Sequence, residues 1–199
     1  AGLDDVRGVD YGGDDGTTGV GEPRPTPRLR FQVASDLHLE MLPQGSDFSS
    51  KLPPALTDLM VLAGDIYVGR ATDFLDVLGQ VASKYRRVLY VAGNHEYYGT
   101  RSEVYSMREV REYISSCCRR IHNLDFLDDS SVTVGGVEFV GGTMWTDIPG
   151  SEYPLANLKM ADFSVIGVDR DEHPVPGGDV RSLSPEDVVE MHDSTKRYF

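Results

Sequence analysis

The sequence has no long apolar run and very few cysteines. None of its apolar runs approaches the roughly 18 residues needed to cross a bilayer, and no segment near the N-terminus resembles a signal peptide. The two cysteines, Cys117 and Cys118, are adjacent within a helical pattern. Neighbours on a helix point in different directions, so these two are poor disulfide partners. We therefore expect a protein that works in a reduced, cytoplasmic setting and has no membrane partner.

Basic residues are also scarce. The 19 Lys and Arg residues face 32 Asp and Glu residues, which gives a formal net charge of −13. Such an excess of negative charge argues against nonspecific binding to nucleic acids or to anionic membranes. The sequence also has no match to G-x-x-x-x-G-K-[ST], which argues against a nucleotide-binding phosphate loop.

The chain divides into a tail and one domain. Residues 1–28 are rich in Gly and Asp and end in GEPRPTPR, a composition that predicts a disordered acidic tail with a stiff linker. Residues 29–199 are long enough for one domain with a core. The first residue is Ala1 and not Met, which is typical of a fragment or a processed chain.

Three short apolar runs end abruptly at polar residues. RFQVASDLHLE breaks at Asp36 and His38, LMVLAGDIYVG breaks at Asp65, and VLYVAGNHEYYG breaks at Asn94 and His95. Short runs of Val, Leu, Ile and Tyr between Gly and Asp are typical of buried parallel strands, and the even spacing of the breaks leaves room for crossover connections. The sequence therefore predicts that these five side chains meet outside the carboxyl ends of one sheet, where α/β sheets bind ligands.

Two amphipathic helices are predicted between these runs and after them. Residues 71–87 carry apolar side chains on one face of a 3.6-residue period, with Thr72 as the expected N-cap, and residues 101–121 repeat the pattern. Strands that alternate with helices indicate an α/β fold.

The C-terminal part has weaker signals. Gly135 and Gly136 separate two β-rich runs and predict a tight hairpin. Residues 167–183 are predicted to form a loop. Ser184 is then expected to begin a last helix, because the Pro and the acidic residues that follow it favour the first turn of a helix.

The polar residues at the three breaks suit a pair of metal ions. Asp36 and His38, two positions apart at an extended strand end, would reach the same ion. Asp65 is the natural bridge between two ions, and Asn94 offers an amide oxygen to the second. Mixed carboxylate and imidazole donors suit Mn, Fe or Zn. His95 is left over, and an imidazole close to the ions can donate a proton to a leaving group.

The segments SDLHLE, AGDIYVG and VAGNHEYYG resemble the D-x-H, G-D and G-N-H-[ED] blocks of the calcineurin-like metallophosphoesterases, and the resemblance extends over residues 29–199. It implies a metallophosphoesterase-type β-sandwich flanked by helices. It also implies two divalent transition metal ions (Mn, Fe or Zn) that activate a water to hydrolyse phosphate mono- or diesters of small molecules. The motifs carry over Asp36, His38, Asp65 and Asn94 as metal ligands and His95 as the general acid.

The sequence departs from the family in its later histidine blocks. A histidine in a G-H or T-H-H setting and a terminal G-H-x-H have no match here. His122 follows a helix, His173 lies in a loop and His192 lies inside the last helix, so none is expected to be a ligand of the family type. We therefore expect a domain truncated at its C-terminus, and a 199-residue chain that is itself poorly active.

One alternative to an enzyme stays open, which is a catalytically inactive phosphoesterase fold kept as a protein-interaction module. The intact His95 favours the enzyme, because a binding scaffold has no need of a proton donor. Of the remaining polar and aromatic side chains, Glu40 and Glu96 are expected to lie around the pocket or on the surface, Trp145 in the core, and Asp162 at a turn or helix cap.

Overall fold

The structure is a computed structural model that describes residues 29–43, 46–52, 54–99, 104–170 and 178–199. The predicted tail, residues 1–28, and His173 lie outside the described residues. Strands and helices alternate along the first part of the domain, which confirms the predicted α/β fold class. Within the described ranges, no helix is both long enough and apolar enough to pass through a membrane.

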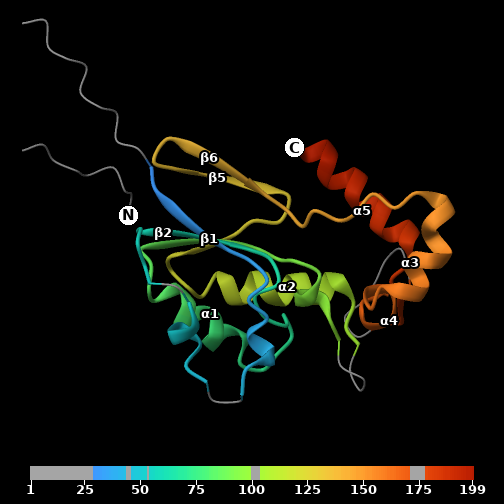
Figure 1. The fold of residues 1–199 in the computed structure, drawn as a ribbon, viewed down its shortest axis with the longest axis horizontal. Coiled ribbons are helices and arrows are strands. Elements are labelled where there is room, and N and C mark those ends of the chain that lie inside the picture. Colours follow the sequence, from blue (N-terminus) through green and yellow to red (C-terminus); the bar gives the residue numbers. More distant parts are fainter. Residues whose placement is uncertain (1–28, 44–45, 53, 100–103, 171–177) are drawn as a thin grey trace, which may run out of the picture.

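Four parallel strands in the order β1-β2-β3-β4 form the central sheet (Figure 1). Their bounds are Phe31–Ala34 (β1), Leu59–Ala63 (β2), Arg87–Val91 (β3) and Leu124–Phe126 (β4). In the register of the first three, Val33 is paired with Val61, and Val61 with Leu89. The three predicted strands and their parallel pairing are confirmed, but β1 is not buried as predicted, since its residues alternate between exposed and half-buried. The fourth strand was not predicted, because three residues are too few to reveal a period.

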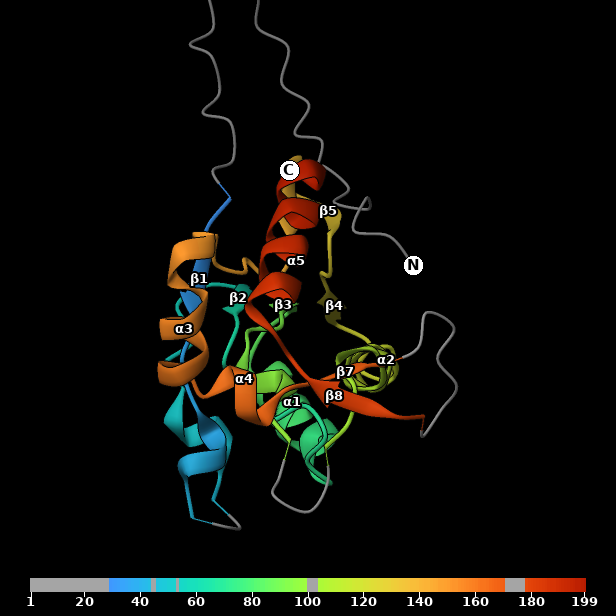
Figure 2. The same cartoon turned by 90° about the vertical axis from the view of Figure 1, so that its right-hand side faces the viewer.

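Helices α1 (Phe74–Ala82) and α2 (Met107–Cys118) cover one face of this sheet (Figures 1 and 2). The face is formed by alternate strand residues, and Met60 of β2 belongs to the same buried cluster as Phe74 of α1 and Ile114 of α2. Both predicted helices are confirmed. The predicted cap at Thr72 is wrong, because α1 begins after Asp73, which makes no side-chain cap and instead accepts a hydrogen bond from Tyr67.

A β-hairpin lies on the opposite face of the sheet (Figure 1). It consists of β5 (Ser130–Val134) and β6 (Val137–Gly141). Its turn residues, Gly135 and Gly136, both have positive φ angles, 57° and 79°, as a two-residue hairpin turn requires. The hairpin prediction is therefore confirmed. A second buried cluster joins β2 and β3 to the hairpin, through Leu59, Leu89, Leu127 and Val134.

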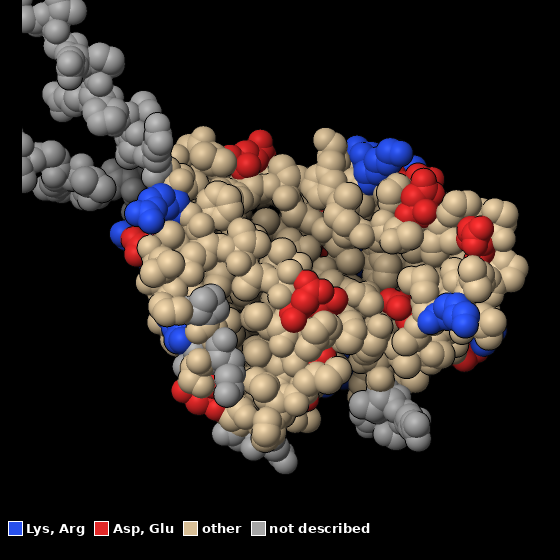
Figure 3. Space-filling model, in the orientation of Figure 1, with Lys and Arg blue, Asp and Glu red and all other residues tan. Residues whose placement is uncertain are grey.

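The hairpin leaves part of that face uncovered. A cleft of about 550 Å³ lies over the sheet and reaches from Val61 and Val91 to Phe199 at the end of the last helix. Figure 3 shows the surface hollowed between the parts labelled β5–β6 and α5 in Figure 1, with charged side chains of both signs scattered around it. One end of the cleft reaches Asn94, at the carboxyl end of β3.

The C-terminal part packs around the carboxyl end of the sheet (Figures 1 and 2). Its helices and strands are α3 (Tyr153–Lys159), α4 (Asp162–Val165), β7 (Gly167–Asp169), β8 (Val180–Ser182) and α5 (Pro185–Tyr198). Short 3₁₀ turns are η1 (Leu39–Met41), η2 (Phe48–Lys51), η3 (His95–Tyr97) and η4 (Gly150–Glu152).

The predicted last helix is confirmed, since α5 begins with a capping box in which Ser184 and Asp187 satisfy each other's backbone N–H groups. The loop prediction for residues 167–183 is wrong in part. β7 and β8 pair in antiparallel fashion within it. Their pairing depends on contacts distant in sequence, such as the ion pair from Arg108 of α2 to Asp169, which local patterns do not reveal.

Candidate metal centre

The loops that follow β1 and β2 are joined by backbone hydrogen bonds beyond the last paired strand residues. The N–H of Asp36 donates to the carbonyl of Gly64 at 3.1 Å, and the N–H of His38 donates to the carbonyl of Asp65 at 3.0 Å. These bonds hold the two loops side by side at the carboxyl edge of the sheet. The predicted approach of the first two strand ends is therefore found.

Three of the predicted residues form a compact group of donor atoms. Ligand atoms of Asp36, His38 and Asp65 all lie within 4.8 Å of one another. Two carboxylates and one imidazole form a donor set that suits a divalent transition metal ion such as Mn, Fe or Zn. The residues present therefore fit the ion that the sequence predicts.

The backbone of these three residues is unusual. Asp36, His38 and Asp65 have φ angles of 53°, 43° and 56°, in the left-handed region that residues with a side chain rarely adopt. Asp36 and His38 therefore do not continue an extended strand, as the sequence suggested, because β1 already ends at Ala34. Strained backbone of this kind persists where the surroundings fix it, and it is concentrated at functional sites.

Asn94 is held at the end of β3 by Asp162. The amide nitrogen of Asn94 donates to Oδ1 of Asp162 at 2.8 Å and to the hydroxyl of Tyr98 at 3.2 Å. Because both bonds use the nitrogen, the amide oxygen is the atom of Asn94 available to a metal ion. Burial, and then the negative charge of Asp162, raises the pKa of Tyr98 to about 12. Sequence reasoning placed Asp162 at a turn, and it does begin α4, but its contact with Asn94 was missed.

The side chain of Glu96 holds together the loops that follow β2 and β3. This side chain is fully buried, with 0% of its surface exposed, and accepts hydrogen bonds from the N–H groups of Asp65, Ile66 and Gly93 and from the Tyr90 hydroxyl, at 2.7–3.0 Å. Burial raises the pKa of its carboxyl group above the ordinary value, and the hydrogen bonds act to lower it. Glu96 is thus a structural support of the candidate site, which agrees with the expected place around the pocket and excludes the surface place that was the other expectation.

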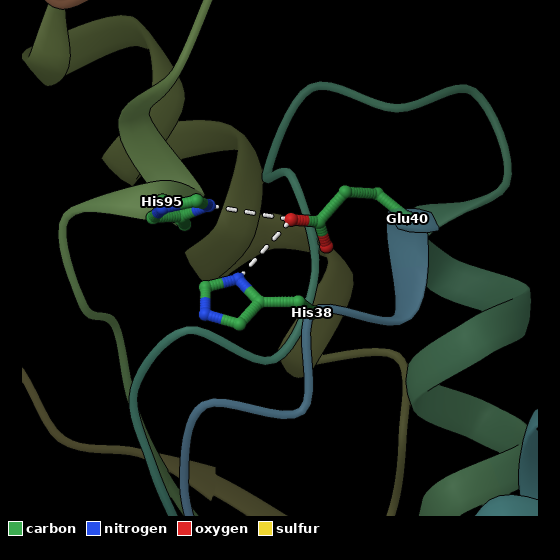
Figure 4. Close-up of side chains that lie close together, drawn as sticks. All are labelled: His38, Glu40 and His95. Carbon is green, nitrogen blue, oxygen red and sulfur yellow. Dashed lines mark hydrogen bonds and ion pairs between the residues drawn. The ribbon is translucent and has the colours of Figure 1, made fainter. Parts of the chain in front are cut away.

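His95 lies among aromatic rings beside the donor group. Its ring stacks on Tyr98, with centroids 4.1 Å apart, and meets His38 edge-on at 4.2 Å. Its backbone N–H donates to Oδ1 of Asp65 at 2.9 Å, which fixes the orientation of that carboxylate. One oxygen of Glu40 lies between the two imidazoles (Figure 4). His95 is therefore close to the predicted ligands without belonging to the Asp36, His38 and Asp65 group.

The other histidines in the described part of the chain lie elsewhere. His122 is exposed, and Nδ1 of His192 lies 2.8 Å from the backbone carbonyl of Trp145. Where the structure describes the chain, two clusters of metal-capable side chains are found, and both are at the carboxyl edge of the sheet. Trp145 packs against the core and Cys117 and Cys118 form no disulfide, as predicted, and both cysteines are buried.

Comparison with known proteins agrees with this geometry. A family model described as Calcineurin-like phosphoesterase (Metallophos) matches residues 29–180. The chain is 24% identical over 143 residues to the uncharacterized protein L509 of Acanthamoeba polyphaga mimivirus, a match that covers 68% of this chain and 51% of that protein. The chain therefore spans about half the length of this curated relative.

A solved structure shares the fold. The crystal structure of Phosphopantetheinyl Hydrolase (PptH) from Mycobacterium tuberculosis matches with a TM-score of 0.57 and 17% identity, covering 84% of this chain and 61% of that one. At this identity the likeness is one of fold alone. The family match, by contrast, spans all three strand-end motifs, two of which supply the Asp36, His38 and Asp65 donor group. The chain belongs to the calcineurin-like phosphoesterase family.

Proposed function

We propose that the protein is a metal-dependent phosphoesterase that hydrolyses phosphate mono- or diesters of small molecules with two divalent transition metal ions (Mn, Fe or Zn). The observation that carries the proposal is the group of Asp36, His38 and Asp65 donor atoms within 4.8 Å of one another, with His95 beside it. This pattern joins metal ligands to a separate proton donor, a combination that hydrolysis needs and simple binding does not.

The donors divide unequally between two ions. Asp36, His38 and Asp65 would hold the first ion, and Asp65 and Asn94 would hold the second. When bound, a pair of such ions lowers the pKa of a shared water and neutralises charge on the phosphoryl group. Asp162 supports this division, because it engages the amide nitrogen of Asn94 and leaves the oxygen for coordination.

His95 would donate a proton to the leaving oxygen of the ester. Its Nδ1 atom is directed at Glu40, so Nε2 is the ring nitrogen left to meet a substrate. Stacking on Tyr98 restricts the rotation of the ring. A general acid in a fixed position contributes typically about 10²- to 10⁴-fold to the rate.

We also infer that residues 29–199 form one domain and that the β5–β6 hairpin belongs to the second layer of a β-sandwich. The support is its packing, through Val134, against Leu59 and Leu89 on the sheet face opposite α1 and α2.

The deciding experiment compares the wild-type chain with Asp65→Asn, measuring metal content and hydrolysis of p-nitrophenyl phosphate and bis(p-nitrophenyl) phosphate. The wild-type chain should retain metal on purification. Because it lacks the later histidine blocks, we expect weak hydrolysis of at least one ester, which should increase when Mn²⁺ is added in excess. Asp65→Asn should lose both properties, because a bridging carboxylate serves both ions. Asp76→Asn, an exposed carboxylate on α1, is the matched control and should change neither.

A folded wild-type chain that binds no divalent metal would contradict the proposal. It would favour instead a phosphoesterase fold that serves as an interaction module.

A further inference from the structure

One oxygen atom of Glu40 is shared between two histidine rings. Oε1 of Glu40 lies 3.3 Å from Nδ1 of His38 and 3.3 Å from Nδ1 of His95. Figure 4 shows both rings directing this nitrogen at the same oxygen. The two histidines follow different strands, β1 and β3, so Glu40 joins two of the three motifs at the carboxyl edge of the sheet.

The Glu40 carboxylate has few other contacts that would explain its position. The Glu40 side chain is only 20% exposed, and its second oxygen, Oε2, is buried without a hydrogen-bond partner among the residues that the structure describes. The carboxylate of Glu96, by comparison, accepts four hydrogen bonds, three from backbone N–H groups and one from the Tyr90 hydroxyl. A carboxylate with one buried oxygen and few partners costs stability, and the contacts of Glu40 with the two imidazoles point to those rings for its role.

We propose that Glu40 is a positioning residue that sets the tautomer and the orientation of both His38 and His95. A carboxylate oxygen accepts hydrogen bonds, so Nδ1 carries the proton in each ring. Nε2 of His38 then has its lone pair free for a metal ion, and Nε2 of His95 is the nitrogen that meets the substrate. Carboxylates that orient histidine ligands in this way are a general device of metal sites. The inference rests on the proposed phosphoesterase function.

Because Glu40 contacts both rings, it couples the proposed metal ligand, His38, to the proposed general acid, His95. If Glu40 moved, the ring of the metal ligand and the ring of the proton donor would both lose the same partner. The centroids of the two rings are 4.2 Å apart, so a rotation of one ring also changes the packing of the other. Loss of Glu40 should therefore affect metal binding and turnover together.

The first test uses the metal-free wild-type chain and needs no variant. Nitrogen-15 NMR of the imidazoles at mildly alkaline pH reports which ring nitrogen carries the proton. We expect His38 and His95 both to carry it on Nδ1. An Nε2–H tautomer at either ring would overturn the proposal.

The second test removes the acceptor. Glu40→Leu keeps the bulk of the side chain, and Glu40→Gln keeps one acceptor oxygen. Mn²⁺ affinity measured by calorimetry should fall about 10- to 100-fold in Glu40→Leu, with Nδ1–H lost at both rings, and Glu40→Gln should restore the tautomers. The control is Glu112→Leu, whose carboxylate is 63% exposed and pairs with Arg108, and it should change none of these readings.

His38, Glu40 and His95 could also be read as direct ligands of one ion, since their donor atoms lie within 4.8 Å of one another. In that case Glu40→Leu would lose one whole equivalent of metal, which would overturn a positioning role. The outcomes also separate this inference from the proposed function. A wild-type chain that binds metal and hydrolyses esters with the wrong tautomer refutes only the role of Glu40, and one that binds no metal refutes the proposed function.

Discussion

Gly93 lies so close to Asp65 that a Cβ atom at position 93 would come within 2.7 Å of the Asp65 backbone nitrogen. Any side chain there must push the loop after β2 away from the loop after β3. Gly93 also donates its N–H to Glu96 at 2.7 Å, so a shift would disturb that buried carboxylate. We predict that Gly93→Ala lowers Mn²⁺ affinity at least about tenfold, because it would displace the carboxylate of Asp65, which is proposed to bridge the two ions.

The matched control is Gly79→Ala in α1, where an added Cβ atom would meet nothing within 4 Å. Alanine stabilises helix interiors relative to glycine by about 0.5–1 kcal/mol, so this variant should be slightly more stable and bind metal normally. Metal titration and urea unfolding of both variants provide the comparison. Wild-type affinity in Gly93→Ala would mean that the close approach of the two loops does not matter to the metal centre.

Loss of the Asp162 carboxylate should lower the affinity for the second ion more than the affinity for the first. Asp162 is 7% exposed and accepts the hydrogen bond from the Asn94 amide nitrogen, so it selects which amide atom faces the metal centre. In Asp162→Ala, the second Mn²⁺ equivalent should bind about 10- to 100-fold more weakly, while the first keeps its affinity. Calorimetric titration with Mn²⁺ separates the two events, and Asp147→Ala, an exposed carboxylate, is the control. An equal loss at both sites would argue for a general structural effect.

The sequence was sufficient to predict three of the four sheet strands and the edge at which the candidate site lies. Parallel strands in α/β proteins have short, continuous apolar runs, and the ends of these runs are easily recognised because the polar residues Asp36, Asp65 and Asn94 follow within a few positions. Parallel pairing then places these ends at one edge whatever the details of the loops. The structure agrees, with Val33, Val61 and Leu89 in register.

The residues that support the site could not be predicted in the same way. Asp162 is 68 positions from Asn94, and no local pattern connects them. Glu40 and His95 are 55 positions apart, and the chain between β1 and η1 turns through a left-handed residue, His38, that no local pattern indicates. A positive φ angle at an Asp or His is set by tertiary hydrogen bonds, and the residue type alone does not indicate it.

The start of α5 should make stability depend on pH in the acid range. Burial acts to raise the pKa of Asp187, but hydrogen bonds from Arg181 and Ser184 outweigh it, so the pKa lies below its ordinary value of 3.8. A lowered pKa in the folded state contributes stability above about pH 4, and that contribution is lost as the pH falls through the folded-state pKa.

Asp187→Asn should therefore destabilise the chain at pH 7 by about 1 kcal/mol, the order of a helix-capping interaction, because Asp187 is the partner of the Ser184 N-cap in the capping box, and by less at pH 3. Urea unfolding of both proteins at the two pH values measures the difference. Glu186→Gln, one position earlier in α5 and exposed, is the control and should leave the free energy of unfolding unchanged. A destabilisation by Asp187→Asn that is equal at both pH values would mean that the charge of Asp187 plays no part.

His95 provides the sharpest test of the chemistry, because its ring is separate from the Asp36, His38 and Asp65 group. His95→Ala should keep most of the metal and lose about 10²- to 10⁴-fold in kcat on an alkyl phosphate, whose leaving oxygen needs a proton. The loss should be much smaller on p-nitrophenyl phosphate, since nitrophenolate leaves without protonation. His122→Ala, at an exposed ring, is the control for removal of a histidine. If kcat fell equally on both substrates while metal content stayed normal, His95 would be needed for binding or orientation of the phosphate and not for proton donation.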